Sequence, residues 1–375
     1  MVNAHQRQSL KLELRKRYNL CSYCISRHLT VGRGRLSDDD FDRCFICCGL
    51  MNRLDFIIGR IEETVKEVYE FDTFLIGTIL PPDIYEREDQ IRARLKIRGK
   101  ESIKNQLLNE LRRKFEIITK KKVDYLLPDV SISVAVGNGM EVNVAAKART
   151  LTLAGHYIKK QRGLPQKQTK CTQCEGRGCG FCNNSGLSGY RSVEGIITHQ
   201  LMCLTKSNAP RFSWVGSEDQ NSLVSGEGRP FFVRLSDPKV RFLRNNLNID
   251  TPEIYAVIEA RPKCVPQSPI RFLTKTKILV ESANTITENN LEDLNLLNNA
   301  TVQFQNKDKI ITKKIYSVEA RKIKDNRFEL TLLADGGFAI KKFVSGLQNT
   351  SPNVSKIVGN KCESILFDIS DVNMQ

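Results

Sequence analysis

Two groups of four cysteines constrain the fold of this chain more than any other feature of its sequence. The first group has the spacing C-x2-C-x19-C-x2-C and consists of Cys21, Cys24, Cys44 and Cys47. The second has the spacing C-x2-C-x4-C-x2-C and consists of Cys171, Cys174, Cys179 and Cys182. Zinc in structural sites takes four ligands at tetrahedral angles, and two CxxC turns can supply four thiolates in that arrangement. The sequence therefore predicts two zinc sites.

Both predicted zinc ions are structural rather than catalytic. A catalytic zinc keeps an open coordination position and commonly has His or carboxylate ligands. The chain has four His residues, and none lies at ligand spacing beside these cysteines. The second loop has few apolar residues to hold it together without metal. Its glycines, Gly176, Gly178 and Gly180, allow tight turns that aim backbone amides at the sulfurs.

The charge balance indicates a polyanionic partner. Lys and Arg number 58 against 42 Asp and Glu, a formal net charge of +16 among 375 residues. Such an excess is typical of proteins that bind nucleic acid, although a solvated basic surface without a partner would give the same count. The sequence contains no apolar run of signal-peptide or membrane-span length. We therefore expect a cytoplasmic protein without membrane association, in a compartment where disulfides are disfavoured.

The first half of the chain predicts an α+β module. The segment FDTFLIGTIL from Phe71 reads as a buried strand that ends before Pro81. An amphipathic helix follows over 101–118, and strands at 123–136 and 140–146 flank a Gly137–Gly139 hairpin turn. The helix also carries a basic group that serves either solubility or contact with an RNA backbone: Lys104, Arg112, Arg113 and Lys114.

The second half is dominated by strand patterns, with a segment over 145–200 that bridges the two halves and carries the second cysteine group. One short helix is expected at 288–297. Strands are expected at 229–235, 253–260, 277–283, 313–323 and 327–335. The chain has no Walker motif, no methyltransferase glycine loop after a strand and no Ser-His-Asp candidate set, so the chemistry rests on carboxylates or is absent.

Several motifs together resemble the archaeal and eukaryotic tRNA pseudouridine synthases that act on the T arm, at uridine 55 and in some members 54. LCSYCISRHL with CFICCGL is similar to the amino-terminal zinc element of that family, and ESIKNQLLNELRRKF through LLPDVSISV is similar to its THUMP-related RNA-binding domain. GHYIKKQRGLPQ, the second cysteine group, GSEDQNSLVSGEGRPFFV and GGFAIKKFVSG resemble successive parts of its catalytic domain.

The resemblance implies roles for four residues. Asp219 falls on the catalytic aspartate, which acts as a nucleophile or as a proton-abstracting base. Lys341 matches the basic residue that keeps the carboxylate ionised. Ile340 would pack against the flipped base, and Arg229 would orient the catalytic loop or bind phosphate. The implied partner is tRNA, bound by a monomer, and the reaction of that family needs no organic cofactor.

The chain departs from the family pattern at three positions. Ser217 stands where the family has an arginine before the Glu-Asp pair, and Asn221 stands where it has a second aspartate. The place of the active-site tyrosine is taken by Thr276 or Lys277. Three tyrosines are candidates to substitute for it in space: Tyr157, Tyr255 and Tyr316.

The predicted architecture is α+β with three parts. A zinc knuckle occupies 1–60, a THUMP-like domain 61–148, and a catalytic domain 149–375 has a mixed, largely antiparallel sheet with the second knuckle at 171–182. The competing hypotheses are an isomerase acting on tRNA, a tRNA-binding protein without activity on the same scaffold, and a zinc-knuckle chaperone or adaptor. The last should carry several knuckles of the second kind, whereas this chain has one.

Overall fold

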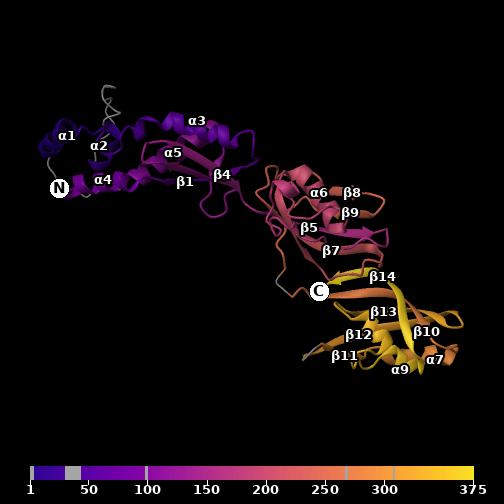
Figure 1. Cartoon of the computed structure of the whole chain (residues 1–375). Coiled ribbons are helices and arrows are strands. Elements are labelled where there is room, and N and C mark those ends of the chain that lie inside the picture. Colours follow the sequence, from indigo (N-terminus) through magenta and orange to yellow (C-terminus); the bar gives the residue numbers. More distant parts are fainter. Residues whose placement is uncertain (1–3, 30–43, 98–99, 267–268, 307–308) are drawn as a thin grey trace. The chain divides into compact units, whose positions relative to one another are not determined.

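The computed structural model describes residues 4–29, 44–97, 100–266, 269–306 and 309–375. The chain divides into two compact units, Met1–Arg149 and Thr150–Gln375 (Figure 1). The fold is of the predicted α+β class. Among the described residues, no helix is both long and apolar enough to cross a membrane.

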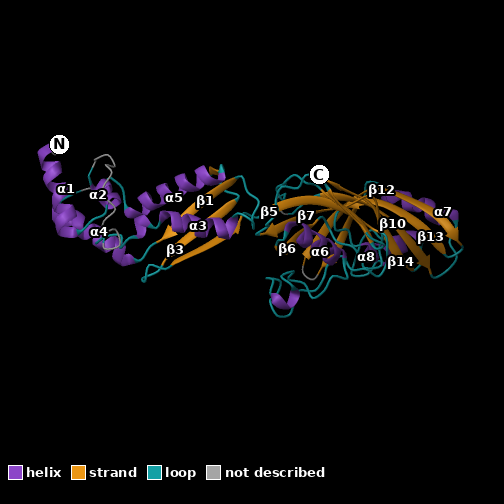
Figure 2. Cartoon of the chain, turned by 90° about the horizontal axis from the view of Figure 1, so that it is seen from above, coloured by secondary structure: helices purple, strands orange, loops and turns teal. Residues whose placement is uncertain are grey.

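Unit 1, Met1–Arg149, packs helices on a four-stranded sheet. Its helices are α1 (Ala4–Tyr18), α2 (Ser22–His28), η2 (Leu50–Asn52), α3 (Leu54–Val65), α4 (Pro82–Leu95) and α5 (Ile103–Thr119). Its strands are β1 (Thr73–Ile79), β2 (Lys122–Val123), β3 (Val130–Val136) and β4 (Val142–Ala148). In the order β2-β1-β3-β4, β1 runs parallel to both neighbours and β3 pairs antiparallel with β4. Helix α5 packs on β1 and α3 packs on β4 (Figure 2).

Local sequence explains the start of helix α5. Ser102 is the N-cap residue directly before the helix, and its side chain accepts a hydrogen bond from the backbone N–H of Asn105. The apolar stripe of α5 buries Ile103, Leu107 and Phe115 completely, as the periodicity predicts. One continuous core runs from α1 through the sheet to β4. This core joins the first cysteine group to the THUMP-like sheet in one packed unit.

The strand expected over 123–136 is shorter than predicted, because its first half is a turn. The carboxylate of Asp124 accepts hydrogen bonds from the backbone N–H groups of Leu126 and Leu127, an Asx-type turn. Pro128 follows with no N–H to donate to a ladder. The apolar residues of this turn are therefore exposed, and β3 begins only at Val130.

Unit 2, Thr150–Gln375, is built on one large sheet. Its strands are β5 (Leu151–Lys159), β6 (Asn208–Trp214), β7 (Val224–Ser236), β8 (Leu247–Asp250), β9 (Ile254–Ile258), β10 (Phe272–Ser282), β11 (Thr301–Asn306), β12 (Lys309–Lys324), β13 (Arg327–Asp335) and β14 (Cys362–Met374). Its helices are η3 (Gly180–Cys182), α6 (Val193–Thr205), α7 (Glu288–Glu292), η4 (Asp293–Leu297), α8 (Ile340–Ser345) and α9 (Val354–Val358).

The sheet of unit 2 is mixed and largely antiparallel, as predicted. Its described strands follow the order β11-β12-β13-β10-β14-β7-β5-β9-β8, and β6 pairs with β7. Strands β14 and β7 form a parallel pair through Ile369 and Val224, and they join two halves that each have their own core. The functional site lies beside this junction.

The segment predicted as a bridge over 145–200 contains strand β5 and the first part of helix α6. Strand β5 is central, paired with β7 on one side and β9 on the other. The sequence pattern did not indicate this strand, because Gly155 lies in its middle. A Cβ there would lie 2.6 Å from the carbonyl oxygen of Val257 and 2.8 Å from the ring of Phe231, so close backbone packing requires glycine.

Candidate active site and metal centres

Asp219 lies in the loop between β6 and β7, and its carboxylate contacts Lys341. The Nζ atom of Lys341, in the first turn of α8, lies 2.8 Å from Oδ2 of Asp219. The backbone N–H of Asn221 donates to Oδ1 at 3.0 Å. These two hydrogen bonds, that from Lys341 foremost, lower the pKa of Asp219 below its usual range. The lowered pKa keeps the carboxylate ionised at neutral pH, and the side chain is 30% exposed, so it is open to a ligand.

A cavity of about 460 Å³ opens beside this pair. Residues on both sides of the β7–β14 junction line it: Ser217, Glu218, Asp219, Arg229, Phe272, Thr274, Thr276, Gly337, Phe338, Ala339, Ile340, Lys341, Lys342, Phe367 and Ile369. Its volume falls in the range of pockets that take small ligands. The lining combines aromatic and apolar side chains with three basic ones, of which Lys341 is exposed. This composition suits a flat, neutral ring attached to an anionic backbone.

A buried charge group lies directly beneath the loop. The side chains of Glu218 and Lys159 are fully buried, with Nζ 3.5 Å from Oε1. Oε2 of Glu218 accepts hydrogen bonds from Nε of Arg229 at 2.8 Å and from the hydroxyl of Tyr157 at 2.7 Å. Burial, with Glu218 beside it, raises the pKa of Tyr157, and burial lowers the pKa of Lys159. Two buried cations thus share one buried carboxylate.

Three basic side chains hold the backbone of the loop by its carbonyl groups. Arg229 donates to the carbonyls of Val215 and Ser217. Lys159 donates to the carbonyls of Asp219 and Gln220, both within 3.2 Å. Arg162 donates to the carbonyl of Asn221 at 2.6 Å and forms a two-pronged ion pair with Asp368. The loop is therefore fixed in place, with the carboxylate of Asp219 directed toward Lys341.

The structure brings all four predicted site residues of this unit to the cavity. Ile340 and Lys341 line its wall at the start of α8, next to Asp219. Arg229 is 1% exposed and is engaged by Glu218 and by the loop carbonyls. That position favours the loop-orienting role over the phosphate-binding role, because a buried guanidinium with these partners presents little surface to an external anion.

Of the positions that depart from the family pattern, two line the cavity, and Asn221 contacts Asp219 through its backbone N–H. Ser217 and Thr276 line it, whereas Lys277 is exposed on the opposite face of β10. The three tyrosines considered as substitutes are not among the lining residues. The aromatic rings that do line the cavity belong to Phe272, Phe338 and Phe367.

Sequence reasoning did not select Lys159, Arg162 or Glu218, and it considered Tyr157 only as a substitute for the active-site tyrosine. One signal was available for two of them. Tyr157 and Lys159 are two residues apart in β5, so they point to the same face of the sheet. A lysine on the core-facing side of a strand needs a buried anion or several acceptors, which is a recognisable sign of a functional site.

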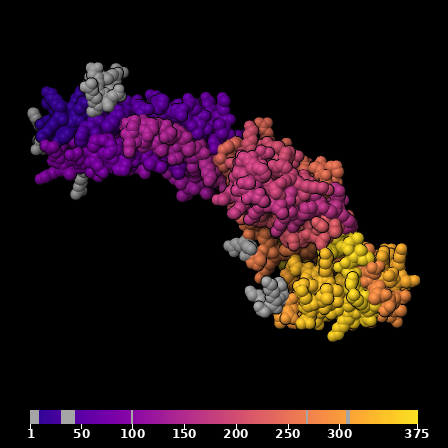
Figure 3. All heavy atoms as spheres, in the orientation of Figure 1, coloured from indigo at the N-terminus to yellow at the C-terminus, as the bar shows by residue number. Residues whose placement is uncertain are grey.

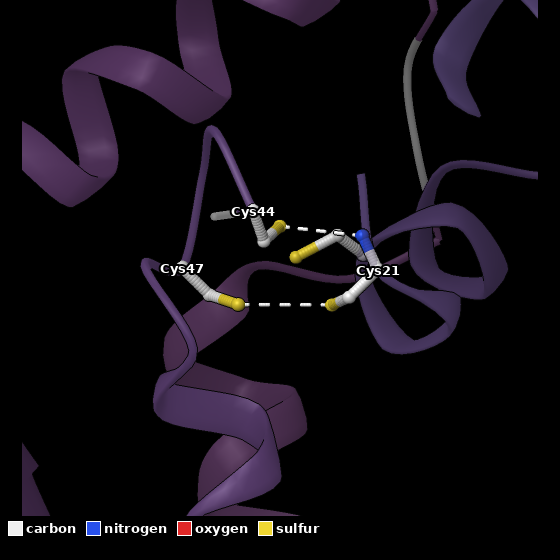
Figure 4. Close-up of side chains that lie close together, drawn as sticks. Cys21, Cys44 and Cys47 are labelled. Atoms are coloured by element: carbon white, nitrogen blue, oxygen red, sulfur yellow. Dashed lines mark hydrogen bonds between the residues drawn. The ribbon is translucent and has the colours of Figure 1, made fainter. Parts of the chain in front are cut away.

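The first cysteine group forms a compact cluster in unit 1 (Figure 4). Its four sulfurs lie within 4.8 Å of one another, and Sγ of Cys21 is 3.6 Å from Sγ of Cys47. Tetrahedral ligands at Zn–S distances of about 2.3 Å would be about 3.8 Å apart, so the spacing fits one metal ion. The guanidinium of Arg27 donates to Sγ of Cys24 at 3.4 Å and to Glu88 of α4 at 2.5 Å, which links the cluster to the helical layer.

The second cysteine group has the same geometry in unit 2. Sγ of Cys182 lies 3.8 Å from that of Cys174 and 3.7 Å from that of Cys179. The predicted amide contacts are present, since the N–H groups of Gly178 and Gly186 donate to Sγ of Cys174 and Cys182. Each group can therefore hold one tetrahedral metal ion.

The basic residues of α5 mostly have partners within unit 1. Arg112 donates to the carbonyl of Ile76, Arg113 pairs with Glu110, and Lys114 lies 2.6 Å from Asp55. Lys104 is exposed at the start of the helix. RNA contact by this group stays a prediction.

Comparison with known proteins identifies the class. A family model described as Pus10, C-terminal, matches residues 152–373, and one described as Pus10 THUMP domain, archaeal, matches 58–135. A tRNA pseudouridine synthase Pus10 of Nitrosopumilus maritimus is 30% identical over 378 residues, covering 97% of each chain. The protein of the same name from Cenarchaeum symbiosum is 30% identical over 369 residues, covering 96% of this chain and 90% of its own.

Among solved structures, a Cbf5-Nop10-Gar1 complex gives a TM-score of 0.31 at 11% identity, over 58% of this chain and 57% of that one. The assignment does not depend on so weak a likeness. The family models and the named relatives instead define a pseudouridine synthase, an isomerase that carries a THUMP domain. The chain belongs to the Pus10 family.

Proposed function

We propose that this protein converts uridine to pseudouridine in the T arm of tRNA, at position 55 or, as the second candidate, position 54. The names of its relatives support tRNA as the substrate, and the choice of the T arm follows from the sequence motifs. The observation that carries the proposal is the Asp219–Lys341 contact at 2.8 Å at the rim of an aromatic-walled cavity. A tRNA-modifying protein of this kind is expected in the cytoplasm.

The reaction is an isomerisation that needs no redox partner. The bond from N1 of uracil to C1′ of ribose breaks, the base rotates, a bond forms from C5 to C1′, and the proton of C5 is lost while N1 gains one. Asp219, kept ionised by Lys341, is the nucleophile or the base in this sequence. The target uridine must leave its stack to reach the cavity, where Ile340 and the phenylalanines would pack against its ring.

Two structural zinc ions belong to the proposal. Each cysteine group would hold one ion, and neither ion takes part in the chemistry because all four positions are filled by thiolates. In unit 1, residues 1–60 form the zinc knuckle and 61–148 the THUMP-like RNA-binding part. Residues 149–375 form the catalytic domain. The protein acts as a monomer.

The test is a pseudouridine map of an unmodified tRNA transcript. Asp219→Asn should lower the single-turnover rate by roughly 10³-fold or more, because it removes the charge and keeps the shape. Asp325→Asn is the matched control, since Asp325 is 87% exposed at a hairpin turn. Transcripts with cytidine at 54 or at 55 then identify the position. Tight binding by the unsubstituted chain without product would refute the isomerase and leave a tRNA-binding protein.

A further inference from the structure

A second cavity lies at one end of unit 1, apart from the catalytic site. It has a volume of about 410 Å³ and lies where the end of α1, the first cysteine knuckle and α4 meet. In Figure 3 the indigo surface of α1 lies beside the purple surface of α4. The residues that line it are Arg17, Tyr18, Asn19, Phe45, Gln90, Ile91 and Arg94.

The lining has the chemistry of a nucleotide site. Among the described residues, its lining offers two guanidinium groups, two aromatic rings and two amides, and no carboxylate. Guanidinium groups match phosphate oxygens in a two-pronged geometry. Aromatic rings stack on unpaired bases of any sequence, and side-chain amides can donate to and accept from a base edge. An acidic peptide would satisfy the guanidinium groups but would leave both rings without a flat partner.

The two arginines are available to an anion. Arg94 is exposed, and its guanidinium carbon lies 5.9 Å from the centroid of the Tyr18 ring. Arg17 lies 5.8 Å from the same centroid. Its carboxylate partner is Glu13, one turn earlier at 3.4 Å, and exposed helical pairs of this kind are weak and screened by salt. Both guanidinium groups therefore flank one ring and can turn to a phosphate.

The aromatic part of the cavity is held by the cysteine knuckle. The rings of Tyr18 and Phe45 lie 6.4 Å apart at 52°. Phe45 follows Cys44 directly, so the cluster fixes its backbone. Nε of Arg87 donates to the carbonyl of Ile46 at 3.3 Å, which ties the knuckle to α4. The cysteine group thus presents an aromatic side chain beside two arginines.

We propose that this cavity binds one unstacked nucleotide of the RNA substrate. The phosphate lies between Arg17 and Arg94, and the base packs against Tyr18 and Phe45. This inference rests on the proposed function, because it assigns unit 1 a contact with the same tRNA that unit 2 modifies. It also gives the first cysteine group a role in RNA recognition beyond stabilising the fold.

The first experiment measures the affinity for tRNA against salt. Arg17→Met with Arg94→Met should weaken binding by about tenfold at physiological salt and lower the slope of log Kd against log salt by about 1 to 2. The rate at saturating tRNA should stay unchanged, since both residues lie outside the catalytic unit. The matched control is Arg60→Met with Lys66→Met. These two exposed basic residues lie on α3 and directly after it, and the control removes the same amount of charge. Equal effects of the two pairs would overturn the proposal.

The second experiment separates base stacking from charge. Hexauridylate and an abasic hexamer of the same phosphate number are bound to the unsubstituted chain and to Phe45→Leu. Hexauridylate should bind more tightly to the unsubstituted chain, and Phe45→Leu should reduce that preference at least about fivefold with metal content unchanged. Equal binding of the two hexamers would indicate a phosphate site only and would overturn the nucleotide assignment.

The two proposals fail in distinguishable ways. If the unsubstituted chain forms pseudouridine and the arginine pair changes nothing in binding, this cavity is no RNA site and the isomerase stands. If no pseudouridine forms but the arginine pair and Phe45→Leu weaken RNA binding as expected, the catalytic proposal fails and the nucleotide site stands.

Discussion

The buried carboxylate of Glu218, beneath the loop that carries Asp219, gives the sharpest prediction, and Glu218→Gln tests it. Glu218 and Lys159 have fully buried side chains, and that of Arg229 is 1% exposed. Glu218 is the carboxylate that both cations contact among the described residues. The substitution keeps the shape of the side chain and removes its charge. Two buried cations would then lack their common anion.

The magnitude follows from the geometry. The glutamine oxygen can still accept from Nε of Arg229 and from the hydroxyl of Tyr157, because both donate to Oε2. Its NH₂ group would then face Nζ of Lys159, where Oε1 now lies at 3.5 Å. Breaking a buried ion pair from one side costs about 3–5 kcal/mol. At about 2–4 °C per kcal/mol for a unit of this size, the melting temperature should fall by about 6–20 °C.

The loss of stability in Glu218→Gln should also depend on pH, and the charge of Lys159 determines the direction of that dependence. Burial already lowers the pKa of Lys159, and Glu218 opposes that shift. Removing the carboxylate lowers the pKa of Lys159 further, so the folded chain binds fewer protons than the unfolded chain below the ordinary lysine pKa. Stability of the variant then rises with pH through that window. The deficit should be larger near about pH 6 than near about pH 9.

Thermal unfolding followed by circular dichroism measures both effects. Glu227→Gln is the control, because it makes the same chemical change at an exposed position of β7 and should alter stability by no more than about 0.5 kcal/mol. If Glu218→Gln and Glu227→Gln have the same melting temperature near pH 6, the buried charge group does not stabilise the fold. A deficit that grows with pH would contradict the assignment to Lys159.

The acid limb, the first metal site and the loop anchors each supply a further test. The low pKa of Asp219 predicts that activity persists until the pH falls below the ordinary carboxyl range. Lys341→Met should move this loss of the single-turnover rate at acid pH to higher pH. If the acid limb of the pH profile does not move, it belongs to another group. Cys24→Ser should remove about one metal ion per chain, measured by elemental analysis, and make unit 1 sensitive to protease while unit 2 stays folded. The control Cys203→Ser, at an exposed thiol, should change neither property. Full metal content in Cys24→Ser would count against the site. Arg162→Met should lower kcat by about tenfold with little change in KM, with partial rescue by lysine, because the loop loses one of its cationic anchors; a loss in KM alone would point to substrate binding instead.

Patterns that are local in sequence were predicted well. The cysteine spacing located both clusters, because each CxxC pair is set by one turn. Helix α5 and strands β9 and β13 followed from periodicity, since each has one face in a core. Strands β5 and β14 were missed. Both lie in the middle of the sheet, where glycine, polar residues and neighbours distant in sequence decide the pairing.

The charge group under the loop could not be predicted from composition. Its members come from β5, from the loop and from β7, and sheet register alone brings Tyr157 opposite Arg229. A lysine or glutamate in an isolated segment is usually exposed, so each residue alone indicated a surface position. The pairing of Asp219 with Lys341 spans 122 residues, and only the resemblance to a family suggested it.

Serine instead of arginine at position 217 changes the lining of the cavity, but residues other than Ser217 hold the carboxylate of Asp219 in place. The loop reaches Arg229 through the backbone carbonyl of Ser217, a contact that any side chain at this position would allow. Lys159 holds the carbonyls of Asp219 and Gln220, while Arg162 and Arg229 hold two further carbonyls of the loop. A serine therefore removes a charge that would face the substrate without releasing the loop. Replacing Ser217 with arginine should then alter affinity or choice of uridine, while the pH dependence set by Asp219 and Lys341 stays the same.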